Sequence, residues 1–206
     1  MVLCAASPSP VARRLSASVR CNLSIVNTGR DNSEARIGGM RNTSQMTQRQ
    51  PSPDNGDPIL HDIAIVPFQP ENQAEVQRLI LAGLTEHWGQ LDPTKNPDLN
   101  DIGATYAHAT FLVAWFHGTI VGTGALMPRS AHSAEIVRMS VAAHLRRHGI
   151  GRRLLQHLMA HAKARGYRHI ILETTATWHD VIAFYQQHGF QITHYRDGDV
   201  YFVLDL

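Results

Sequence analysis

The periodicity of apolar positions divides the chain into two parts. Residues 1–57 are rich in Ser, Arg, Asn, Gln and Pro and have no sustained period of 2 or 3.6. From residue 58 onward, short apolar runs alternate with stretches whose apolar positions recur every three or four residues. The turn-rich segment 52–58 lies at the boundary. The pattern predicts a disordered or targeting-like extension over residues 1–57 and a folded domain over residues 58–206.

The folded part is predicted to have the element order β-α-α-β-β-β-α-β-α-β-β. This order mixes hairpins with two crossover helices, which indicates an α/β domain built on one mixed, mostly antiparallel sheet flanked by about four helices. Glycines after the last two helices act as stop signals. Strands are expected at 63–68, 111–116, 119–126, 134–141, 169–174, 190–195 and 200–204, and helices at 70–84, 96–106, 149–165 and 178–188.

The net positive charge of the chain comes from residues 1–57. The whole chain carries 19 Lys and Arg against 17 Asp and Glu, a net charge of +2. Residues 1–57 hold seven of the basic and four of the acidic residues, which leaves 12 basic and 13 acidic residues for the folded domain. With 43% hydrophobic residues, the chain can bury a sizeable core. An anionic partner, if there is one, must therefore be bound locally rather than by a basic domain surface.

Cysteine usage and apolar run length exclude several classes of protein. Both cysteines, Cys4 and Cys21, fall in the first part, so the folded domain offers neither a thiol nucleophile nor a thiolate metal site. No apolar run approaches the ~20 residues of a membrane-spanning helix. We expect a cytoplasmic protein with no membrane partner. Organelle targeting is the alternative, because residues 1–30 contain four Arg and no acidic residue.

The strongest chemical signal is a glycine-containing turn at a predicted helix start. Arg146-Arg147-His148-Gly149-Ile150-Gly151 follows the strand at 134–141 and leads into an amphipathic helix. Backbone N–H groups at a helix start are free to converge on an anion, and side chains at the two glycine positions would block its approach. Arg146, Arg147, Arg152 and Arg153 add positive potential. The alternative is a helix that simply starts after glycines, with arginines facing solvent.

The context of this turn resembles the GNAT superfamily of acetyl-CoA-dependent N-acetyltransferases. The family fingerprint Gln/Arg-x-x-Gly-x-Gly/Ala is matched by residues 146–151, preceded by the strand 135–141. Residues 170–174 match the next strand, and Tyr185 to Phe190 resembles the Tyr-x-x-x-Gly-Phe signature that ends the family's last helix. The likeness covers residues 59–206. It implies a GNAT-like fold.

The resemblance also implies where acetyl-CoA binds. The turn would take the pyrophosphate through backbone amides, here those of Arg146, Arg147, His148, Gly149, Ile150 and Gly151, with Arg152 as a further contact. The preceding strand would separate from its neighbour at a bulge, so that Met139, Ser140 and Val141 pair with the pantetheine arm. A backbone N–H there, that of Met139, would stabilise the thioester oxygen as it becomes an oxyanion.

Two side chains are candidates for proton transfer. A lysine-type amine has a pKa near 10.4 and must lose a proton before it attacks. Glu135 stands where histone-acetylating family members carry their catalytic glutamate; the alternatives are an exposed glutamate or a pair with Arg138. Tyr185 stands where the family carries the donor for the leaving thiolate; the alternative is a core tyrosine. Trp178 replaces an Asn that contacts pantetheine in many members, so that contact is in doubt, and Trp178 would line the acyl pocket or cap the helix.

The histidines are a weaker signal. His144 with His148 and His157 with His161 have the i, i+4 spacing of metal ligands on a helix, but no Cys or carboxylate joins either pair. We expect solvated histidines and no bound metal. His179 or His188 could replace Glu135 as the base.

These features predict an acyltransferase that moves an acetyl group from acetyl-CoA to a primary amine of a small molecule or a protein, by direct transfer in a ternary complex. The alternative is a non-catalytic acyl-CoA-binding regulator on the same fold. Residues 85–108 and 128–133 would determine which amine is accepted, but their sequence does not indicate that amine. We expect no nucleic-acid partner; a homodimer is compatible with the sequence.

Overall fold

The computed structural model describes residues 58–206, apart from the side chains of Pro58 and Pro93. The expectations for the extension, namely its targeting-like bias and its cysteines Cys4 and Cys21, lie outside the described residues. The boundary at residue 58 stays a prediction for the same reason.

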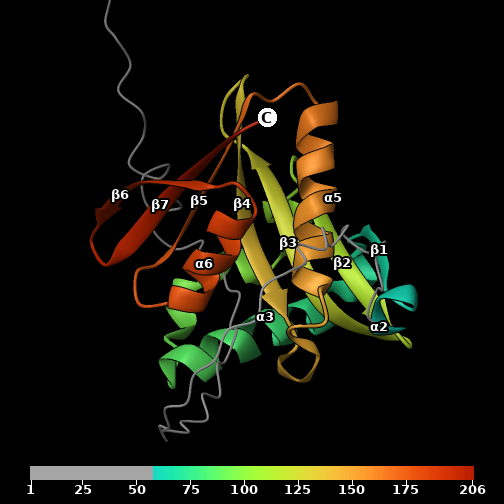
Figure 1. Cartoon of the computed structure of the whole chain (residues 1–206). Helices are drawn as coiled ribbons and strands as arrows, with labels where there is room; N and C mark the ends of the chain where they lie inside the picture. Colours follow the sequence, from blue (N-terminus) through green and yellow to red (C-terminus); the bar gives the residue numbers. More distant parts are fainter. Residues whose placement is uncertain (1–57) are drawn as a thin grey trace, which may run out of the picture.

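One seven-stranded sheet organises the described chain (Figure 1). The strand order is β1-β2-β3-β4-β5-β7-β6, and only the β4–β5 pair is parallel. This confirms the predicted mixed, mostly antiparallel sheet. The strands are β1 Ala64–Pro67, β2 Thr110–Phe116, β3 Thr119–Pro128, β4 Ser133–Val141, β5 His169–Thr175, β6 Gln191–Arg196 and β7 Asp199–Asp205.

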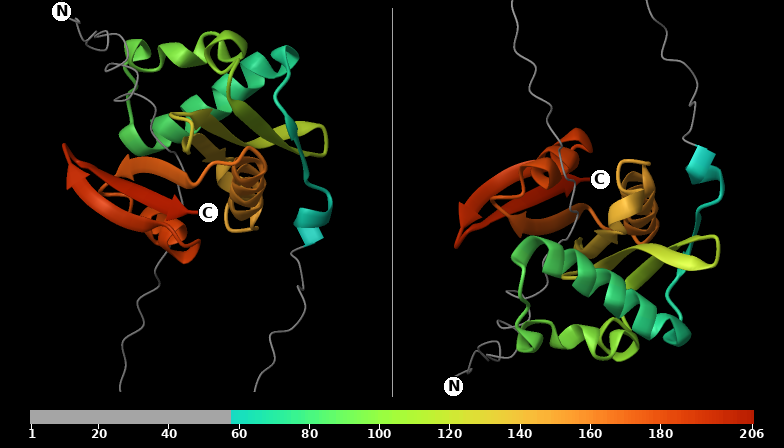
Figure 2. Two further views of the ribbon diagram at one scale, coloured as in Figure 1. Left: turned by 90° about the horizontal axis from the view of Figure 1, so that it is seen from above. Right: turned by 90° about the horizontal axis from the view of Figure 1, so that it is seen from below.

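Helices cover both faces of the sheet. Figure 2 shows α3 (Gln73–Trp88) and the short α4 (Ile102–Thr105) on one face, with α5 (Ile150–Ala164) and α6 (His179–Gln187) on the other. The predicted helical spacing explains which faces are buried: Val76, Ile80 and Leu84 of α3 are buried, as are Leu154 and Leu158 of α5. A short helix, α2 (Pro58–His61), precedes β1.

The sheet separates two hydrophobic cores. The larger core joins α5 and α6 to residues such as Ile136 and Met139 of β4. The smaller core lies under α3 and α4 and includes Val137 of β4. Successive β4 residues therefore serve different cores, as expected when side chains alternate across a strand. Fully burying each Leu, Ile or Val side chain contributes about 1.5–3 kcal/mol.

The predicted helix over residues 96–106 is wrong. The chain there forms the 3₁₀ turns Pro93–Lys95 and Pro97–Leu99, followed by the four-residue α4. The Asp101 side chain accepts a hydrogen bond from the Ala104 backbone, which starts α4 anew. Leu99, Ile102 and Tyr106 are buried as their spacing suggested, but separate turns place them rather than one continuous helix.

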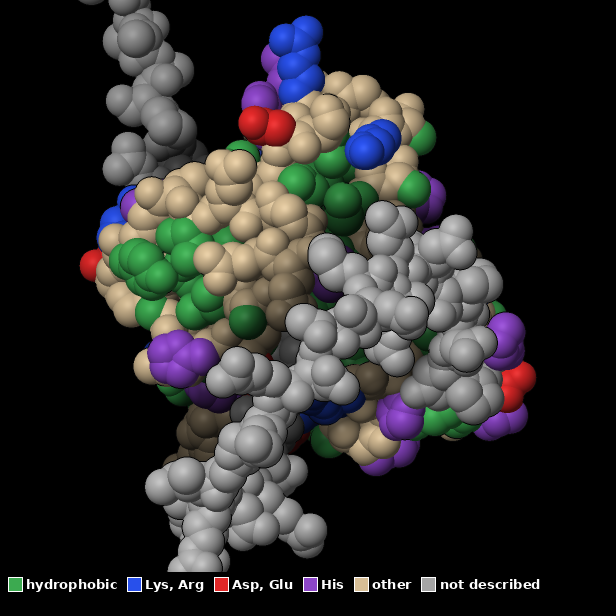
Figure 3. Space-filling view, in the orientation of Figure 1, with side chains coloured by type: hydrophobic (Ala, Val, Ile, Leu, Met, Phe, Trp, Pro, Cys, Tyr) green, Lys and Arg blue, Asp and Glu red, His purple; other side chains and the backbone are tan. Residues whose placement is uncertain are grey.

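Side chains of several kinds share the face shown in Figure 3. Hydrophobic side chains lie among polar ones over the β6–β7 hairpin. The exposed large apolar residues of the described chain are Val66, Trp88, Ile171 and Tyr195. Among residues 58–206, none of the helices combines the length and the apolar character that crossing a bilayer requires.

Candidate active site

β4 and β5 run side by side for only three residues. The parallel pairing joins residues 133–135 of β4 to residues 169–171 of β5. Past these residues β5 pairs with β7, and β4 pairs with β3. The β5–β7–β6 part of the sheet turns away from the first four strands (Figure 1). The edge of β4 over residues 136–141 thus has no neighbouring strand in the described chain, and such an edge can pair with another extended chain.

A bulge lies in β4 at the point of separation. The β3–β4 register steps from Ala125 opposite Val137 to Thr123 opposite Ser140, so Gly124 faces both Arg138 and Met139. Arg138 has a φ of 55°, in the left-handed region. A Cβ on Gly124 would lie 2.5 Å from the Met139 sulfur, so a larger residue would displace that side chain. The structure confirms the expected bulge and separation.

The strand residues after the bulge offer only their backbone to a ligand. The side chains of Met139, Ser140 and Val141 are buried, with exposed fractions of 0%, 2% and 4%. Met139 and Val141 belong to the core under α5. Backbone N–H and C=O groups on the free edge are therefore the chemistry that this stretch can supply.

The turn before α5 brings backbone amides to the start of a helix. After the 3₁₀ turn Ala143–Leu145, Arg147 and Gly149 adopt positive φ values of 69° and 83°. Gly149 is the N-cap of α5, and no side chain caps the helix. The first helical bond runs from Arg153 N–H to the Gly149 carbonyl, so the amides of residues 150–152 have no intrahelical acceptor. This arrangement is suited to bind an anion.

The four arginines of this region have different surroundings. The Arg146 guanidinium binds Glu86 of α3 through both ends, with N–O distances of 2.7 and 2.6 Å, and donates to the Val141 carbonyl at 3.1 Å. Arg153 donates to the Leu60 carbonyl. Arg147 and Arg152 are exposed. The charge of Arg146 is therefore offset by Glu86, and its side chain links the turn to α3, whereas Arg147, Arg152 and Arg153 add positive charge near the helix start.

Glu135 is buried at the opposite end of β4. Its carboxylate pairs with Arg129, not with Arg138. Glu135 lies in register with Met127, on the face of the sheet that α3 covers. Burial raises the pKa of the Glu135 carboxyl, and the positive charge of Arg129 opposes this shift. A carboxylate with a raised pKa beside a strand edge can accept a proton at neutral pH.

Tyr185 lies on α6 inside the larger core. Its exposed fraction is 0%, and its ring contacts Phe184, Phe190 and Phe202 at centroid distances of 5.2, 5.5 and 5.9 Å. The described structure thus places Tyr185 among aromatic side chains, as the core alternative expected. Its hydroxyl can reach a thiolate only from within this packed group.

Trp178 joins the two halves of the sheet. It is the N-cap residue of α6, and its indole N–H donates to His87 near the end of α3. The His87 and Trp178 rings meet edge to face at 4.3 Å, and Trp88 lies 6.4 Å from Trp178. Burial lowers the pKa of His87, which keeps its ring nitrogen available as an acceptor. Trp178 thus occupies the helix-cap position, although its side chain makes no capping hydrogen bond, and a place in the acyl pocket stays a prediction.

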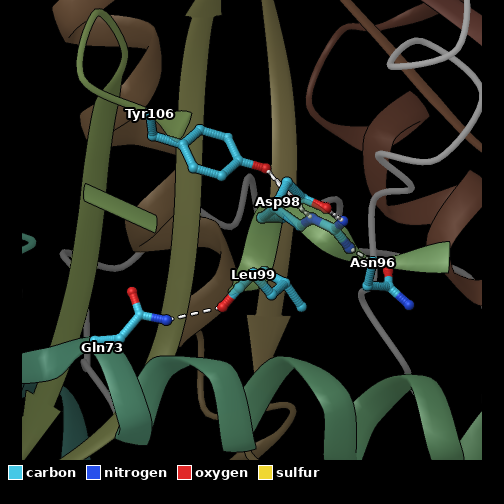
Figure 4. Close-up of polar contacts among 6 residues, drawn as sticks. Gln73, Asn96, Asp98, Leu99 and Tyr106 are labelled. Carbon is cyan, nitrogen blue, oxygen red and sulfur yellow. Dashed lines mark hydrogen bonds and ion pairs between the residues drawn. The ribbon is translucent and has the colours of Figure 1, made fainter. Parts of the chain in front are cut away.

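A buried polar network beside the bulge is the feature that sequence reasoning missed (Figure 4). Arg138 is fully buried and binds both carboxylate oxygens of Asp98, at 2.9 and 2.5 Å. It also donates to Asn96 at 3.1 Å, and the Tyr106 hydroxyl donates to Asp98 at 2.7 Å. The one available signal is an arginine in the mostly apolar run 134–141, whose other polar residues are Glu135 and Ser140.

The remaining candidate groups are histidines on α5 and α6. His157 and His161 are exposed on α5, and burial lowers the pKa of His157. His188 contacts the Phe184 carbonyl at 2.7 Å. Across residues 58–206, no three His, Cys, Asp or Glu side chains gather as a metal ion would require.

A family model describes much of the chain. The model of the acetyltransferase (GNAT) family matches residues 74–190, from α3 to the end of α6. This range includes β4, the bulge, the turn before α5, and both Glu135 and Tyr185.

Curated relatives share about a third of their residues with the matched part of the chain. A probable N-acetyltransferase 14 of Xenopus tropicalis is 32% identical over 103 residues, which cover 48% of this chain and 50% of that protein. An IAA acetyltransferase of Azospirillum brasilense is 33% identical over 131 residues, which cover 63% of this chain and 84% of that protein. The chain spans about half the length of the first two curated relatives that it matches.

Solved structures share the fold. A GNAT-family acetyltransferase of Staphylococcus aureus superposes with a TM-score of 0.65 at 22% identity, covering 70% of this chain and 99% of that one. A PaiA N-acetyltransferase of Thermoplasma acidophilum, solved in complex with coenzyme A, has a TM-score of 0.62 at 18% identity, with 70% and 99% covered.

Proposed function

This chain belongs to the GNAT acetyltransferase family, and from that premise we propose that it transfers the acetyl group of acetyl-CoA directly to a primary amine. The observation that carries the proposal is the combination of an uncapped helix start at Gly149 with a free, bulged edge of β4. The two features lie at opposite ends of one continuous segment, so one extended ligand with an anionic group can contact both.

The residues of this segment fit acetyl-CoA as a co-substrate. The amides of residues 146–151 would hold the pyrophosphate, because the φ of +83° at Gly149 turns the backbone into the helix without a side chain on the ligand side. Arg147 and Arg152 would add charge from the exposed rim. The backbone of Met139, Ser140 and Val141 would pair with the pantetheine arm. Coenzyme A in the Thermoplasma acidophilum neighbour supports this assignment.

The bulge would support the chemical step. As the amine attacks the thioester, the C–N bond forms, the carbonyl oxygen gains negative charge, and the C–S bond then breaks. The Met139 N–H beside the bulge is the backbone donor proposed for that oxygen. Its side chain is fixed in the core under α5, so the direction of the N–H would change little during the reaction.

Proton transfers would involve Glu135 and Tyr185. Glu135 would accept the proton that the ammonium loses, either directly or through water, since its raised pKa makes the carboxylate a stronger base than an exposed glutamate. Tyr185 would protonate the leaving thiolate. Its present burial requires the sulfur to approach the aromatic group of α6.

A non-catalytic acyl-CoA-binding regulator is the second candidate. It is favoured by one observation: Tyr185 is fully buried and Glu135 is paired with Arg129, so neither side chain faces open solvent. Both candidates share the acetyl-CoA site, and they differ only in turnover.

A scan of primary amines separates the two candidates. Purified full-length chain is incubated with acetyl-CoA and each amine, and released CoA thiol is measured; acetyl-CoA affinity is measured by calorimetry. We expect turnover with at least one amine, and a loss of about 10²-fold or more in Glu135→Gln. Tyr185→Phe should lower kcat, while Tyr195→Phe, on the exposed face of β6, should not.

The outcomes are distinct. Binding of acetyl-CoA without turnover on any amine of the panel would support the regulator and refute the enzyme. Absence of binding in the wild type would refute both candidates. Full activity of Glu135→Gln would remove Glu135 as the base and direct attention to His179 or His188.

A further inference from the structure

We propose that Arg138 is a positioning residue: its buried ion pair with Asp98 fixes the segment 92–106, here called the anchored segment, relative to the bulge of β4. This inference rests on the proposed function, because it explains how the free edge of β4, where acetyl-CoA would bind, keeps a constant distance from the segment that would hold the amine. The pair joins residues 40 positions apart in the chain.

The bulge needs support from its surroundings. A non-glycine residue is strained in the left-handed region, and Arg138 adopts a φ of 55° there. The Thr123 hydroxyl donates to the Arg138 carbonyl at 2.8 Å, which holds the bulge from the β3 side. The side chain of Arg138 holds it from the other face through Asp98. Between them, these contacts determine where the next N–H, that of Met139, points.

The ion pair fixes geometry rather than adding net stability. The side chains of Arg138 and Asp98 are 1% and 2% exposed. A buried ion pair gains little over apolar residues of similar size, because both charges lose their hydration. A planar guanidinium bound through two nitrogens to one carboxylate, however, allows only one mutual orientation. The ion pair therefore fixes the position of the anchored segment, which contains Asp98, relative to the bulge.

The anchored segment depends on such contacts because it has little regular structure. It consists of two 3₁₀ turns and the four-residue α4. Gln73 of α3 holds it at one place by donating to the Leu99 carbonyl at 2.8 Å (Figure 4). The Gln73 side chain also accepts a hydrogen bond from the Ile102 N–H at 2.9 Å. Arg138 holds it at a second place through Asp98 and Asn96.

Tyr106 closes the network at the end of the anchored segment. Its hydroxyl donates to Asp98 at 2.7 Å and lies 3.4 Å from the Arg138 Nε. Burial raises the pKa of the Tyr106 hydroxyl, so it stays protonated and remains a donor. Asn96, in the first part of the anchored segment, and Tyr106, at its end, thus contact the same Arg138 guanidinium.

The consequence for transfer is a fixed spacing between two substrate sites. The anchored segment covers the α3 face of the sheet, where Glu135 also lies. An amine held by this segment would meet the thioester at the bulge only if segment and bulge keep their relative position. Misplacement of reacting atoms by about 1 Å can lower a rate by about 10²-fold.

The test compares Asp98→Asn with Val76→Ala in the full chain. Asp98→Asn weakens the ion pair, whereas Val76→Ala removes buried methyl groups of the same core without touching the network. Hydrogen–deuterium exchange is followed over residues 92–106 and 137–141, and kcat, KM for the amine and acetyl-CoA affinity are measured. Tyr106→Phe, which removes one hydroxyl, is the milder second variant.

We expect exchange in the two segments of Asp98→Asn to accelerate together by about tenfold or more. Its kcat for amine transfer should fall about tenfold while acetyl-CoA affinity stays within about twofold. Tyr106→Phe should show the same pattern with smaller changes, and Val76→Ala should lose stability but keep kcat.

Two results would overturn the proposal: acceleration confined to residues 92–106, or Asp98→Asn with unchanged kcat at a temperature where it is folded. A wild type that neither binds acetyl-CoA nor acetylates any amine would refute the proposed function instead. The exchange experiment would then still decide whether Arg138 couples the two segments.

Discussion

The proposed coenzyme side and the proposed amine side of this molecule are built in opposite ways. The coenzyme side is one continuous segment, residues 136–152, that offers backbone groups: a strand edge, a bulge and an uncapped helix start. The amine side is assembled from side chains far apart in the chain, with Arg138 of β4 binding Asp98, and Gln73 of α3 binding the backbone near Leu99. The first depends on local geometry, and the second depends on the tertiary structure.

This difference explains why the two sides would tolerate change differently. A backbone site requires only residues that permit the right φ and ψ, so many side chains are acceptable outside its glycines. A side-chain network requires each partner, since removing one leaves a buried group unpaired. We therefore expect substitutions to impair the coenzyme side at only one or two positions, but to impair the amine side at any residue of its network.

The largest expected effect comes from Gly149→Glu on the coenzyme side. The φ of +83° at Gly149 disfavours any side chain, a Cβ would lie 3.1 Å from Leu60, and a carboxylate would repel the pyrophosphate. We expect acetyl-CoA affinity to fall about 100-fold or more, equivalent to ~2.7 kcal/mol, measured by calorimetry.

Gly166→Glu is the matched control for this prediction. Gly166 follows the other end of α5 with a similar φ of +75°, and no atom lies within 4 Å of a Cβ placed there. It carries the same backbone penalty far from the helix start, so its acetyl-CoA affinity should remain unchanged. Equal losses of affinity in both variants would show that backbone strain, not the anion site, is responsible.

A smaller effect, on the amine side, is expected from Arg129→Gln. Burial raises the pKa of Glu135 and Arg129 lowers it, so removing the positive charge raises the pKa further. If Glu135 is the base, it then becomes protonated at a higher pH, and the acidic limb of kcat/KM moves to higher pH. The measurement is the pH dependence of kcat/KM for an accepted amine.

Arg78→Gln serves as the comparison, because Arg78 is an exposed arginine of α3 that contacts only the backbone of its own helix in the described structure. Its acidic limb should coincide with that of the wild type. An unshifted limb in Arg129→Gln would mean that another group, such as His179 or His188, sets the pH dependence.

The contrast also separates what sequence could and could not predict. The strand, the turn and the helix of residues 134–165 follow from local periodicity and glycines, and the structure places each of them where expected. The helical spacing of Leu99, Ile102 and Tyr106 predicts one helix over residues 96–106. That spacing arises instead from separate turns whose buried residues face one core.

The partners of Arg138 could not be predicted from the sequence, for a physical reason. An arginine within an apolar strand indicates a buried charge, but the partner must be chosen among all carboxylates that the fold brings near. The chain offered Glu135 three residues away, whereas the structure pairs Arg138 with Asp98 and Glu135 with Arg129. The bulge decides this outcome, because it turns Arg138 toward the α3 face at the level of Asp98.

The smallest expected effect is at the contact between the two sides, where Glu86 of α3 binds Arg146 of the coenzyme turn. The hydrogen bond from Arg146 lowers the pKa of Glu86, so this contribution to stability is present above the unfolded pKa near 4.5 and is lost as pH falls through the folded pKa. The Glu86 side chain is 37% exposed, so screening limits the contribution to roughly 0.5 kcal/mol. Glu86→Gln should therefore lower Tm by about 1–2 °C at pH 7.

The pH and salt dependence of that shift tests whether the two sides are joined by charge. The difference in Tm between wild type and Glu86→Gln should shrink below pH 4.5 and in high salt, while Glu71→Gln, an exposed glutamate near the start of α3, should show no shift at any pH. Acetyl-CoA affinity should change by less than about threefold, because the ion pair positions the Arg146 side chain and leaves the amides of the turn in place. A shift that persists at low pH would show that Glu86 acts through packing, and the two sides would then be mechanically rather than electrostatically connected.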